Sequence, residues 1–520
     1  MRGSGPLWRL LGEARRANLA DSGAPPPIAV TQGVTRRRVL AALGAAATLP
    51  VIGLPRPARA AGLRVAVIGG GMAGLVALDR LAAAGIDATL YEARGRLGGR
   101  VLTANNLPEP GLDIEDGGNL INTDHADMLA LAKRFGIGLI DRKPMTAHNR
   151  YVVDGVLLDD AALVAGLRPI AEQIGKDAAA LDADYDAMAP ELDAISVTAY
   201  LDRHADLFDA KVRALLEATI RTEFGAEPGQ ASAIELLFNL PVVDGAQAEL
   251  ISLSDERFIL KGGSSSVVRA LSAPLMERIQ TGKALTAIVR GESGLTLRFA
   301  DGSAAEADRV IVTVPAPLMR TIDYGDLLPA GWRTVVGEIE SGRNEKINAG
   351  YALRGWQPAT GPAGAAWAVD TRGPGVFSEF WEASSGQAGV AGVLTYFFGG
   401  DQVDALMAGD VVDMLRKAEA AVAPAVPGLR ARSMRRTAWG KDPFSRGAYS
   451  SFRPGQLTRF AGHFWLEEDG KVTPPADAGP ILFAGEHLSD AFPGYMNGGA
   501  QTGRLAADAL LASLALQQAA

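Results

Sequence analysis

Residues 65–74 read VAVIGGGMAG, and this stretch decides the fold. Its apolar first half is typical of a buried parallel strand, and the amphipathic pattern over 73–84 predicts a helix directly after it. Gly69 permits the tight turn between them, and Gly71 lets the backbone approach a pyrophosphate. Gly74 allows the helix to pack closely on the strand. The N-terminus of such a helix offers free N–H groups and a partial positive charge to phosphates.

A carboxylate completes this pattern. Glu92 ends a second predicted strand, within the sequence YEAR at 91–94. At this place a carboxylate can accept hydrogen bonds from both hydroxyls of an adenosine ribose. A purely structural glycine-rich turn would leave Glu92 unexplained, so the strand, the glycines, the helix and the acid together predict dinucleotide binding.

The residues before this unit predict export from the cytoplasm. Residues 35–40 read TRRRVL and open a mildly apolar stretch over 39–54, which is short for a membrane span. A small-x-small cleavage site follows, ARA at 58–60. The adjacent arginines favour the twin-arginine route, which carries folded proteins, over an ordinary secretory signal or an uncleaved anchor. We therefore expect a twin-arginine signal peptide and linker over 1–61, and a periplasmic or secreted bacterial protein.

Composition limits the class of protein. The chain has 520 residues, 48% of them hydrophobic, which suits two interleaved domains with large cores. It has no cysteine, which excludes disulfides and thiol catalysis, and its five histidines lack ligand spacing, so no metal site is expected. Residues 1–60 carry nine arginines against two acids, so the total charge of −8 leaves about −15 on the mature chain. This acidity argues against a nucleic-acid partner.

The remaining chain alternates between two kinds of pattern. Long helical patterns with acidic faces predict a helical insert over 125–250. Alternating patterns predict strands at 344–354, 365–370 and 390–398, which suggest a second, mixed sheet. A closing amphipathic helix is expected over 497–516. No later segment is apolar enough to span a membrane.

Motifs along nearly the whole mature chain resemble those of the flavin-dependent amine oxidases, a family that includes monoamine, polyamine and L-amino-acid oxidases. In order, they are VIGGGMAG, YEARGRLGGRV, DIEDGGNLI, FILKGGSSSVVRAL, DRVIVTVPAPL, TAWGKDPFSRGAYSSFRPG and ILFAGEHLSDAFPGYMNGGAQTGRLAA. The last is the most specific, because GEH followed by GYMxGG is not a general dinucleotide-fold feature. The resemblance implies an α/β fold, in which a Rossmann-like FAD-binding domain is interleaved with a substrate domain of mixed β-sheet plus helical insert. The expected ranges are 62–142, 250–322 and 430–520 for the FAD-binding domain, and 143–249 and 323–429 for the substrate-binding domain.

The resemblance also implies the residues that bind FAD. Ala73 and its glycine loop would hold the pyrophosphate, Glu92 the ribose, and the backbone of Leu285 the adenine. Glu486 would lie near the ribityl–phosphate region, and the N–H of Met496, beside a helix N-terminus, would face the flavin pyrimidine carbonyl. The remaining expected contacts are Arg94 and Arg100 with the phosphate and ribityl groups, and Gly118 and Asn119 after the predicted strand at 112–116. For the two arginines, a surface salt-bridge pair is the alternative.

Three residues carry the implied chemistry. Tyr449 and Tyr495 occupy the positions of two aromatic rings that sandwich the amine against the flavin and align it. Lys346 matches a lysine that holds a water against flavin N5, although a strand-edge lysine pointing into solvent is the alternative. Ala448 stands where some members carry a cysteine that binds FAD covalently, so the resemblance implies non-covalent FAD.

The implied reaction is hydride transfer from the amine carbon to flavin N5, which gives an imine that water hydrolyses to an aldehyde or keto acid. O₂, or a redox carrier such as a cytochrome or quinone, would reoxidise the flavin. Amino-acid oxidases of the family carry a Met-Arg pair that clamps the substrate carboxylate, and Asn119-Leu120 stands there instead. An amine is therefore expected over an amino acid, although Arg150 could serve a carboxylate. A flavin desaturase or isomerase of apolar substrates, a non-catalytic FAD-binding protein and a homodimer are left open.

Overall fold

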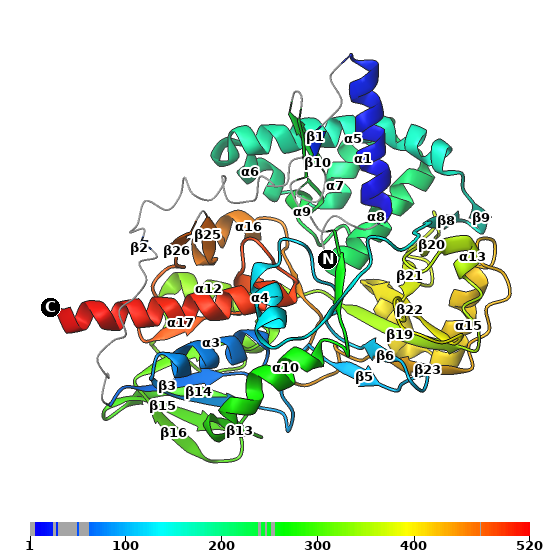
Figure 1. The fold of residues 1–520 in the computed structure, drawn as a ribbon. Coiled ribbons are helices and arrows are strands. Elements are labelled where there is room, and N and C mark those ends of the chain that lie inside the picture. Colours follow the sequence, from blue (N-terminus) through cyan, green and yellow to red (C-terminus); the bar gives the residue numbers. More distant parts are fainter. Residues whose placement is uncertain are drawn as a thin grey trace.

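The computed structural model describes residues 6–23, 28–29, 49–50, 62–237, 241–244, 247–250, 255–468 and 470–519. The predicted twin-arginine motif at 35–40 and the predicted cleavage site at 58–60 lie outside these residues. Figure 1 shows the sheets of the two predicted domains next to each other, with a group of helices above them.

A five-stranded parallel sheet carries the dinucleotide motif. Its order is β13 (Ile279–Thr281), β4 (Asp87–Glu92), β3 (Arg64–Ile68), β17 (Arg309–Val312) and β27 (Ile481–Phe483). Residues 65–68 of β3 are buried and apolar, as expected for a parallel strand covered on both faces. The predicted helix after β3 is α3 (Met72–Ala83), and it packs against α17 (Met496–Ala519), the predicted closing helix (Figure 1).

The glycine turn between β3 and α3 is as tight as the sequence predicts. A β-carbon at Gly74 would lie 1.9 Å from the carbonyl oxygen of Gly69, and Gly69 itself has a φ of +108°. The Thr313 hydroxyl at the end of β17 donates to the carbonyl of Ile68 at 2.8 Å. Helix and strand therefore touch through backbone atoms alone, with no room for a side chain.

A seven-stranded mixed sheet forms the second layer. Its order is β23 (Ser433–Arg436), β19 (Asn344–Tyr351), β22 (Gly392–Gly399), β21 (Glu379–Glu382), β20 (Ala365–Val369), β8 (Arg150–Val153) and β9 (Val156–Leu157). Only β20 and β8 pair in parallel. The three strands predicted at 344–354, 365–370 and 390–398 are confirmed as β19, β20 and β22.

The two faces of this sheet have different neighbours. Side chains such as Ile347, Tyr396 and Phe380 belong to a separate apolar core that includes residues of α14 (Asp401–Ala408) and α15 (Val411–Ala421). Because successive side chains of a strand point to opposite faces, Lys346, next to Ile347, points away from that core.

The helical insert is shorter than predicted. Helices occupy residues 160–237, as α5 (Asp160–Ala183), α6 (Tyr185–Asp193), α7 (Val197–Arg203), α8 (Ala210–Phe224) and α9 (Ala233–Leu237). Residues 139–157, expected within the insert, instead form β7 (Leu139–Asp141), β8 and β9. The reason is strand pairing: β7 pairs with β12 (Phe258–Leu260), and β8 extends the mixed sheet.

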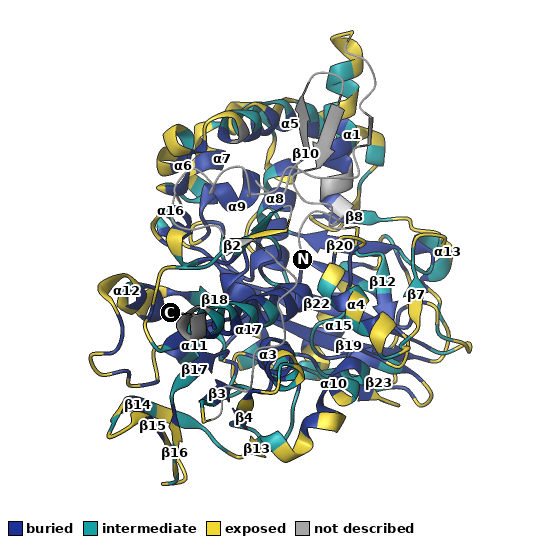
Figure 2. Ribbon diagram, turned by 60° about the vertical axis from the view of Figure 1, so that its left-hand side comes forward, coloured by how far each residue is buried: buried dark blue, intermediate teal, exposed yellow. Residues whose placement is uncertain are grey.

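A helix also precedes the predicted export signal. Residues 6–21, expected within a signal peptide and linker, form α1 (Pro6–Asp21), which packs against α5 in both views of the molecule (Figures 1 and 2).

Figure 2 shows buried residues along β19, β22 and α8, and exposed ones on the β14–β16 hairpins. The other elements are α4 (Ala126–Arg134), α10 (Ser265–Ser272), α11 (Ala316–Met319), α12 (Ala330–Glu338), α13 (Gln357–Thr360), α16 (Gln456–Arg459), β1 (Ile28–Ala29), β2 (Leu49–Pro50), β5 (Thr103–Asn105), β6 (Asp113–Glu115), β10 (Pro241–Asp244), β11 (Gln247–Leu250), β14 (Leu285–Gly291), β15 (Gly294–Phe299), β16 (Ala304–Ala307), β18 (Glu340–Ser341), β24 (Ser450–Ser451), β25 (Leu466–Glu468), β26 (Lys471–Thr473) and the 3₁₀ turns η1 (Ala205–Leu207), η2 (Ala273–Arg278), η3 (Ala461–His463) and η4 (Glu486–Leu488).

Substituting Gly74→Ala should destabilise the protein by about 3 kcal/mol, because overpacking of this kind forces backbone shifts. Urea unfolding followed by circular dichroism measures the change. Gly95→Ala is the matched control, since a β-carbon there meets no atom within 4 Å. Equal stability of the two variants would show that the contact between Gly69 and Gly74 is not tight.

Candidate active site

A cavity of about 440 Å³ extends from the glycine turn of the parallel sheet to the mixed sheet. The structure brings all but one of the predicted site residues to its wall; the exception is Gly74, which is buried in the contact between α3 and β3. The predicted residues that line it are Gly69, Gly71, Ala73, Glu92, Arg94, Arg100, Gly118, Asn119, Leu285, Lys346, Tyr449, Tyr495, Glu486 and Met496. Their individual roles remain predictions.

One end of the cavity combines a buried carboxylate with a helix N-terminus that is suited to bind an anion. The carboxylate of Glu92 is 3% exposed and accepts hydrogen bonds from the backbone N–H groups of Gly70 at 2.6 Å and Arg94 at 2.8 Å. Helix α3 begins after Gly71, which provides no side-chain cap, and a β-carbon at Gly71 would meet no atom within 4 Å. The helix N-terminus therefore points its N–H groups toward open space in the cavity.

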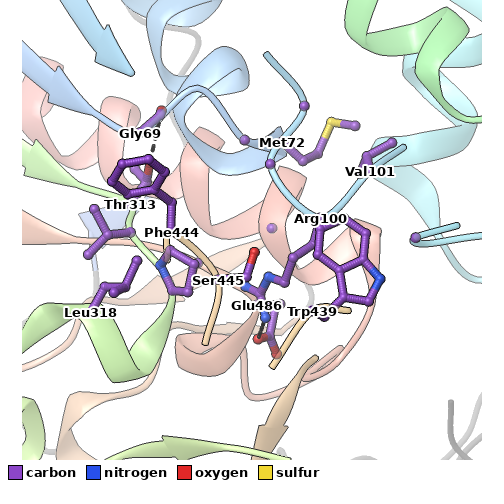
Figure 3. Close-up of a pocket in the computed structure, with 18 of the residues that line it drawn as sticks. Gly69, Met72, Arg100, Val101, Thr313, Leu318, Trp439, Phe444, Ser445 and Glu486 are labelled. Carbon is purple, nitrogen blue, oxygen red and sulfur yellow. Dashed lines mark hydrogen bonds and ion pairs between the residues drawn. The ribbon is translucent and has the colours of Figure 1, made fainter. Parts of the chain in front are cut away.

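The two predicted arginines are not a surface pair. Arg94 is bound to Asp442 and donates to the Ser445 hydroxyl at 2.8 Å. Arg100 lies 2.9 Å from Glu486 and also donates to the carbonyl of Ala448. In Figure 3, Arg100 and Glu486 point toward each other beside Trp439. Both guanidinium groups are therefore held at the cavity wall.

Glu486 joins several segments around this wall. Burial by itself would raise the pKa of its carboxyl, but Arg100, His487, the Gly494 N–H and the Ser450 hydroxyl outweigh burial and lower that pKa. The hydrogen bonds from Gly494 and Ser450 measure 2.7 and 2.9 Å. Glu486 is therefore a buried anion that fixes Arg100 and the loop before α17.

The opposite wall is the inner face of the mixed sheet. Lys346 on β19 is paired with Phe397 on β22, and Phe397 is paired with Glu379 on β21. Lys346, Phe397 and Trp381 line the cavity, and Trp381 shares a face with Glu379 because the two are two residues apart. This wall is therefore aromatic with one cation, and the acid Glu379 lies in the same cross-strand row without lining the cavity.

Lys346 is buried, so the alternative of a solvent-facing lysine is wrong. Its Nζ donates to the carbonyls of Gly117 at 2.7 Å and Glu115 at 3.2 Å. Burial lowers the pKa of this amine to about 8, against the opposing effect of the Glu115 and Asp116 carboxylates. Burial likewise raises the pKa of Glu115 to about 7. The ammonium can thus lose its proton close to neutral pH.

Tyr449 and Tyr495, the two rings predicted to sandwich the amine, come from different segments of the chain. Tyr449 precedes β24, and its hydroxyl donates to the carbonyl of Thr222 at the end of α8. Tyr495 precedes α17, and its ring lies 4.7 Å from that of His125. The helical insert, the mixed sheet and the last helix therefore meet at this part of the cavity.

Comparison with known proteins decides the family. Residues 72–511 match the family described as flavin containing amine oxidoreductase. The chain belongs to this family.

This amine oxidoreductase aligns with several relatives over nearly their whole length. It is 28% identical to (S)-6-hydroxynicotine oxidase of Paenarthrobacter nicotinovorans over 86% of this chain and 99% of that protein. It is 25% identical to putrescine oxidase of Kocuria rosea over 86% of this chain and 95% of that protein. Among solved structures, putrescine oxidase bound to putrescine has a TM-score of 0.73 at 21% identity, covering 86% of this chain and 99% of the other. Cyclohexylamine oxidase from Brevibacterium oxydans has a TM-score of 0.71 at 22% identity, covering 87% and 99%.

The cavity residues of this amine oxidoreductase fit FAD. Glu92, the open helix N-terminus at Gly71 and the two arginines suit a ribose and a pyrophosphate. A β-carbon at Gly118 would lie 2.7 Å from the Met496 Cγ, so the glycine leaves the space that the Met496 side chain occupies at the cavity. When bound, FAD accepts a hydride equivalent from the carbon that bears the amine. The protein is thus an FAD-dependent oxidoreductase that acts on amines, the first of the functions expected from its sequence.

Sequence reasoning missed a group of acids near Tyr449, none of which lines the cavity. Glu379, Glu223 and Glu256 surround Tyr449 closely enough to raise the pKa of its hydroxyl, after the larger effect of burial. The available signal for Glu379 was its place at the start of the short aromatic strand EFWE. Arg150, the suggested partner of a substrate carboxylate, does not line the cavity, and its Nε donates to the Ala359 carbonyl. Arg142 lies among the acids instead.

Two further observations concern the described ranges only. Within them, no group of three or more His, Asp or Glu side chains could hold a metal ion. No helix in these ranges is long and apolar enough to cross a membrane.

Gly71→Ala should weaken FAD binding at least about tenfold and leave the stability of the FAD-free protein within about 0.5 kcal/mol. The backbone at Gly71 is extended, with φ −79° and ψ −173°, so alanine fits the fold, but its methyl group would occupy the space open to the pyrophosphate. Acid precipitation followed by absorbance of the supernatant measures bound FAD. Unchanged FAD content after dialysis would place the pyrophosphate elsewhere.

Lys346→Met should retain FAD and slow turnover at least about a hundredfold, the lower end of the contribution expected of an acid–base group. At saturating amine, the wild-type kcat should show a transition near pH 8, where the amine of Lys346 changes charge, and the variant should lack this transition. Glu115→Gln is the second variant. It removes an anion that raises the pKa of Lys346, so the transition should move to lower pH. A kcat for Lys346→Met within a factor of two of wild type would contradict the role.

Proposed function

We propose that this flavoprotein oxidises an amine that lacks an α-carboxylate and carries a second cationic nitrogen away from the reacting one. The amine end would lie between Tyr449 and Tyr495, whose faces attract a cationic or polarised nitrogen. The apolar body would lie along Trp381 and Phe397. The observation that carries the proposal is the buried carboxylate of Glu379.

The surroundings of Glu379 make it a recognition group for a cation. The residue is 8% exposed, and no residue in the described ranges hydrogen-bonds to its side chain. Its pKa lies well above the usual value, first because of burial and then because of Glu223 and Glu256. Burial and the two neighbouring acids disfavour the anion of Glu379, and the ammonium group of a substrate would favour it.

The charge balance near Tyr449 disfavours a substrate carboxylate. Three carboxylates, those of Glu223, Glu256 and Glu379, stand against the one guanidinium of Arg142. Arg142 already interacts with Glu256 and Glu379, and it donates to the Glu256 carbonyl at 3.1 Å. An amino acid would bring a further negative charge into this group, which like-charge repulsion opposes. The similarity to putrescine oxidase, named for a diamine, supports the same substrate class.

Other parts of the function are proposed on fewer observations. FAD would be bound non-covalently, because Ala448 lines the cavity and the chain contains no cysteine. The electron acceptor would be O₂, giving hydrogen peroxide, with a cytochrome or quinone as the alternative for an exported enzyme. A homodimer would be compatible with the exposed outer faces of the helical insert.

The substrate class can be measured with butane-1,4-diamine, butylamine and ornithine. We expect kcat/KM for the diamine to exceed that for butylamine by about 10–100-fold, because a charge-assisted hydrogen bond contributes about 1.5–3 kcal/mol. Ornithine should be the poorest substrate. A hundredfold preference for ornithine would instead identify an amino-acid oxidase.

Glu379→Gln tests the residue behind this preference. It should remove most of the advantage of the diamine and change kcat/KM for butylamine less than about threefold, so the monoamine is an internal control. Glu277→Gln, at an exposed position, is the matched control variant. If Glu379→Gln lowers both activities equally, the carboxylate does not recognise the second nitrogen.

We also propose that the protein is exported by the twin-arginine route to the periplasm or beyond. The support is the sequence TRRRVL, the apolar stretch after it and the ARA site at 58–60. Replacing Arg36 and Arg37 by lysine should leave active, unprocessed protein in the cytoplasm, as measured by cell fractionation and mass spectrometry. Normal processing of this variant would indicate the general secretory route.

A further inference from the structure

We propose that the helical insert contains a binding groove for α1, and that α1 stays bound there as a separate chain when the segment between it and the enzyme body is cut. The enzyme would then act as a two-chain complex. The inference stands on the contacts of α1 and does not depend on the route of export.

The apolar side of α1 matches the groove. Leu7, Leu10, Leu11 and Ala14 are at most 1% exposed, and their spacing of three and four residues places them on one side of the helix. They belong to the same apolar core as residues of α5, namely Leu163, Leu167, Ile170, Ala171 and Ile174. An isolated helix of 16 residues is marginal in water, so its stability comes from this contact.

Polar contacts fix the position of α1 along the groove. Asn18 makes two hydrogen bonds with Arg168: its side-chain amide donates to the backbone carbonyl of Arg168 at 2.9 Å, and its Oδ1 accepts from the Arg168 Nε at 2.7 Å. Arg15 forms an ion pair with Glu172. A β-carbon at Gly175 would lie 2.9 Å from the Arg15 Nε, so the glycine leaves the space through which Arg15 passes. Surface shape and polar partners therefore both select this helix.

The groove is connected to the substrate end of the cavity. Helix α1 also contacts α8, whose C-terminal turn supplies the Thr222 carbonyl that accepts the Tyr449 hydroxyl. The same turn carries Glu223, which interacts electrostatically with Glu379. Occupancy of the groove therefore supports the part of the wall that binds the amine, whereas the FAD-binding residues lie on other elements.

A cut introduced after Ala60 tests whether α1 stays bound. A protease recognition sequence placed there, in full-length holoenzyme made in a host without the twin-arginine system, gives two fragments on cleavage. We expect them to co-elute at a ratio of one to one in gel filtration, as determined by mass spectrometry. Elution of the short fragment alone would overturn the proposal.

Substitutions within α1 test whether the apolar side is responsible. Leu10→Asp combined with Leu11→Asp should release the fragment after cleavage, raise KM for the amine at least threefold and leave FAD content unchanged. Ala20→Asp, which adds one negative charge at an exposed position, should retain the fragment and the wild-type KM. Loss of FAD together with the fragment, or release by Ala20→Asp, would contradict a specific groove that supports the substrate site.

A labelled peptide keeps the test independent of folding. A fluorescent peptide of residues 6–23 should exchange into the cut wild-type enzyme and raise fluorescence anisotropy. The same peptide with both aspartates should not. Equal behaviour of the two peptides would overturn the groove.

Discussion

Compensation of buried charge is the constraint on which this cavity depends. Charged side chains are taken from water at both ends, and each needs a partner to remain ionised. Glu486 has Arg100 and three further neighbours, Arg94 has Asp442, and Lys346 has two carbonyls and two nearby acids. Glu379 is the exception, because its neighbours are mainly other acids. The place where compensation is incomplete is the place where a charged substrate can supply it.

The mixed sheet separates apolar side chains from aromatic and charged ones by placing them on opposite faces. Its strands present an apolar face to α14 and α15 and an aromatic, charged face to the cavity, and the period of two along each strand separates these roles. Strand register then sets the spacing across the wall, since Lys346, Phe397 and Glu379 follow one another from β19 to β21. A one-residue shift of β21 would exchange Glu379 for Phe380 and turn the acid toward the opposite face of the sheet.

The amino-acid sequence was sufficient for the cofactor end and for most of the architecture. The glycine motif and Glu92 are local in the chain, and the strands of the mixed sheet follow from the periodicity of apolar residues. The interleaved two-domain α/β fold was implied by the resemblance to the family. The acid at position 379 was not predicted, because its place in the cross-strand row depends on pairing between strands that are distant in sequence. The strands at 139–157 were missed for the same reason. Helix α1 shows a different limit: its apolar spacing was present, but the export motif after it favoured a leader interpretation for the whole segment.

The contacts of Lys346 and its neighbours also have a mechanical meaning. Lys346 binds the carbonyls of Glu115 and Gly117, while Asn348 and Arg435 bind the Asp116 carboxylate at 3.2 and 2.6 Å, and the Trp439 Nε1 donates to the Asp116 carbonyl at 3.0 Å. These bonds fasten the segment after β6 to the edge of the mixed sheet. These bonds oppose a hinge motion that would separate the two sheets, because such a motion would have to break all of them together. Entry of an amine by such a motion is therefore unfavourable.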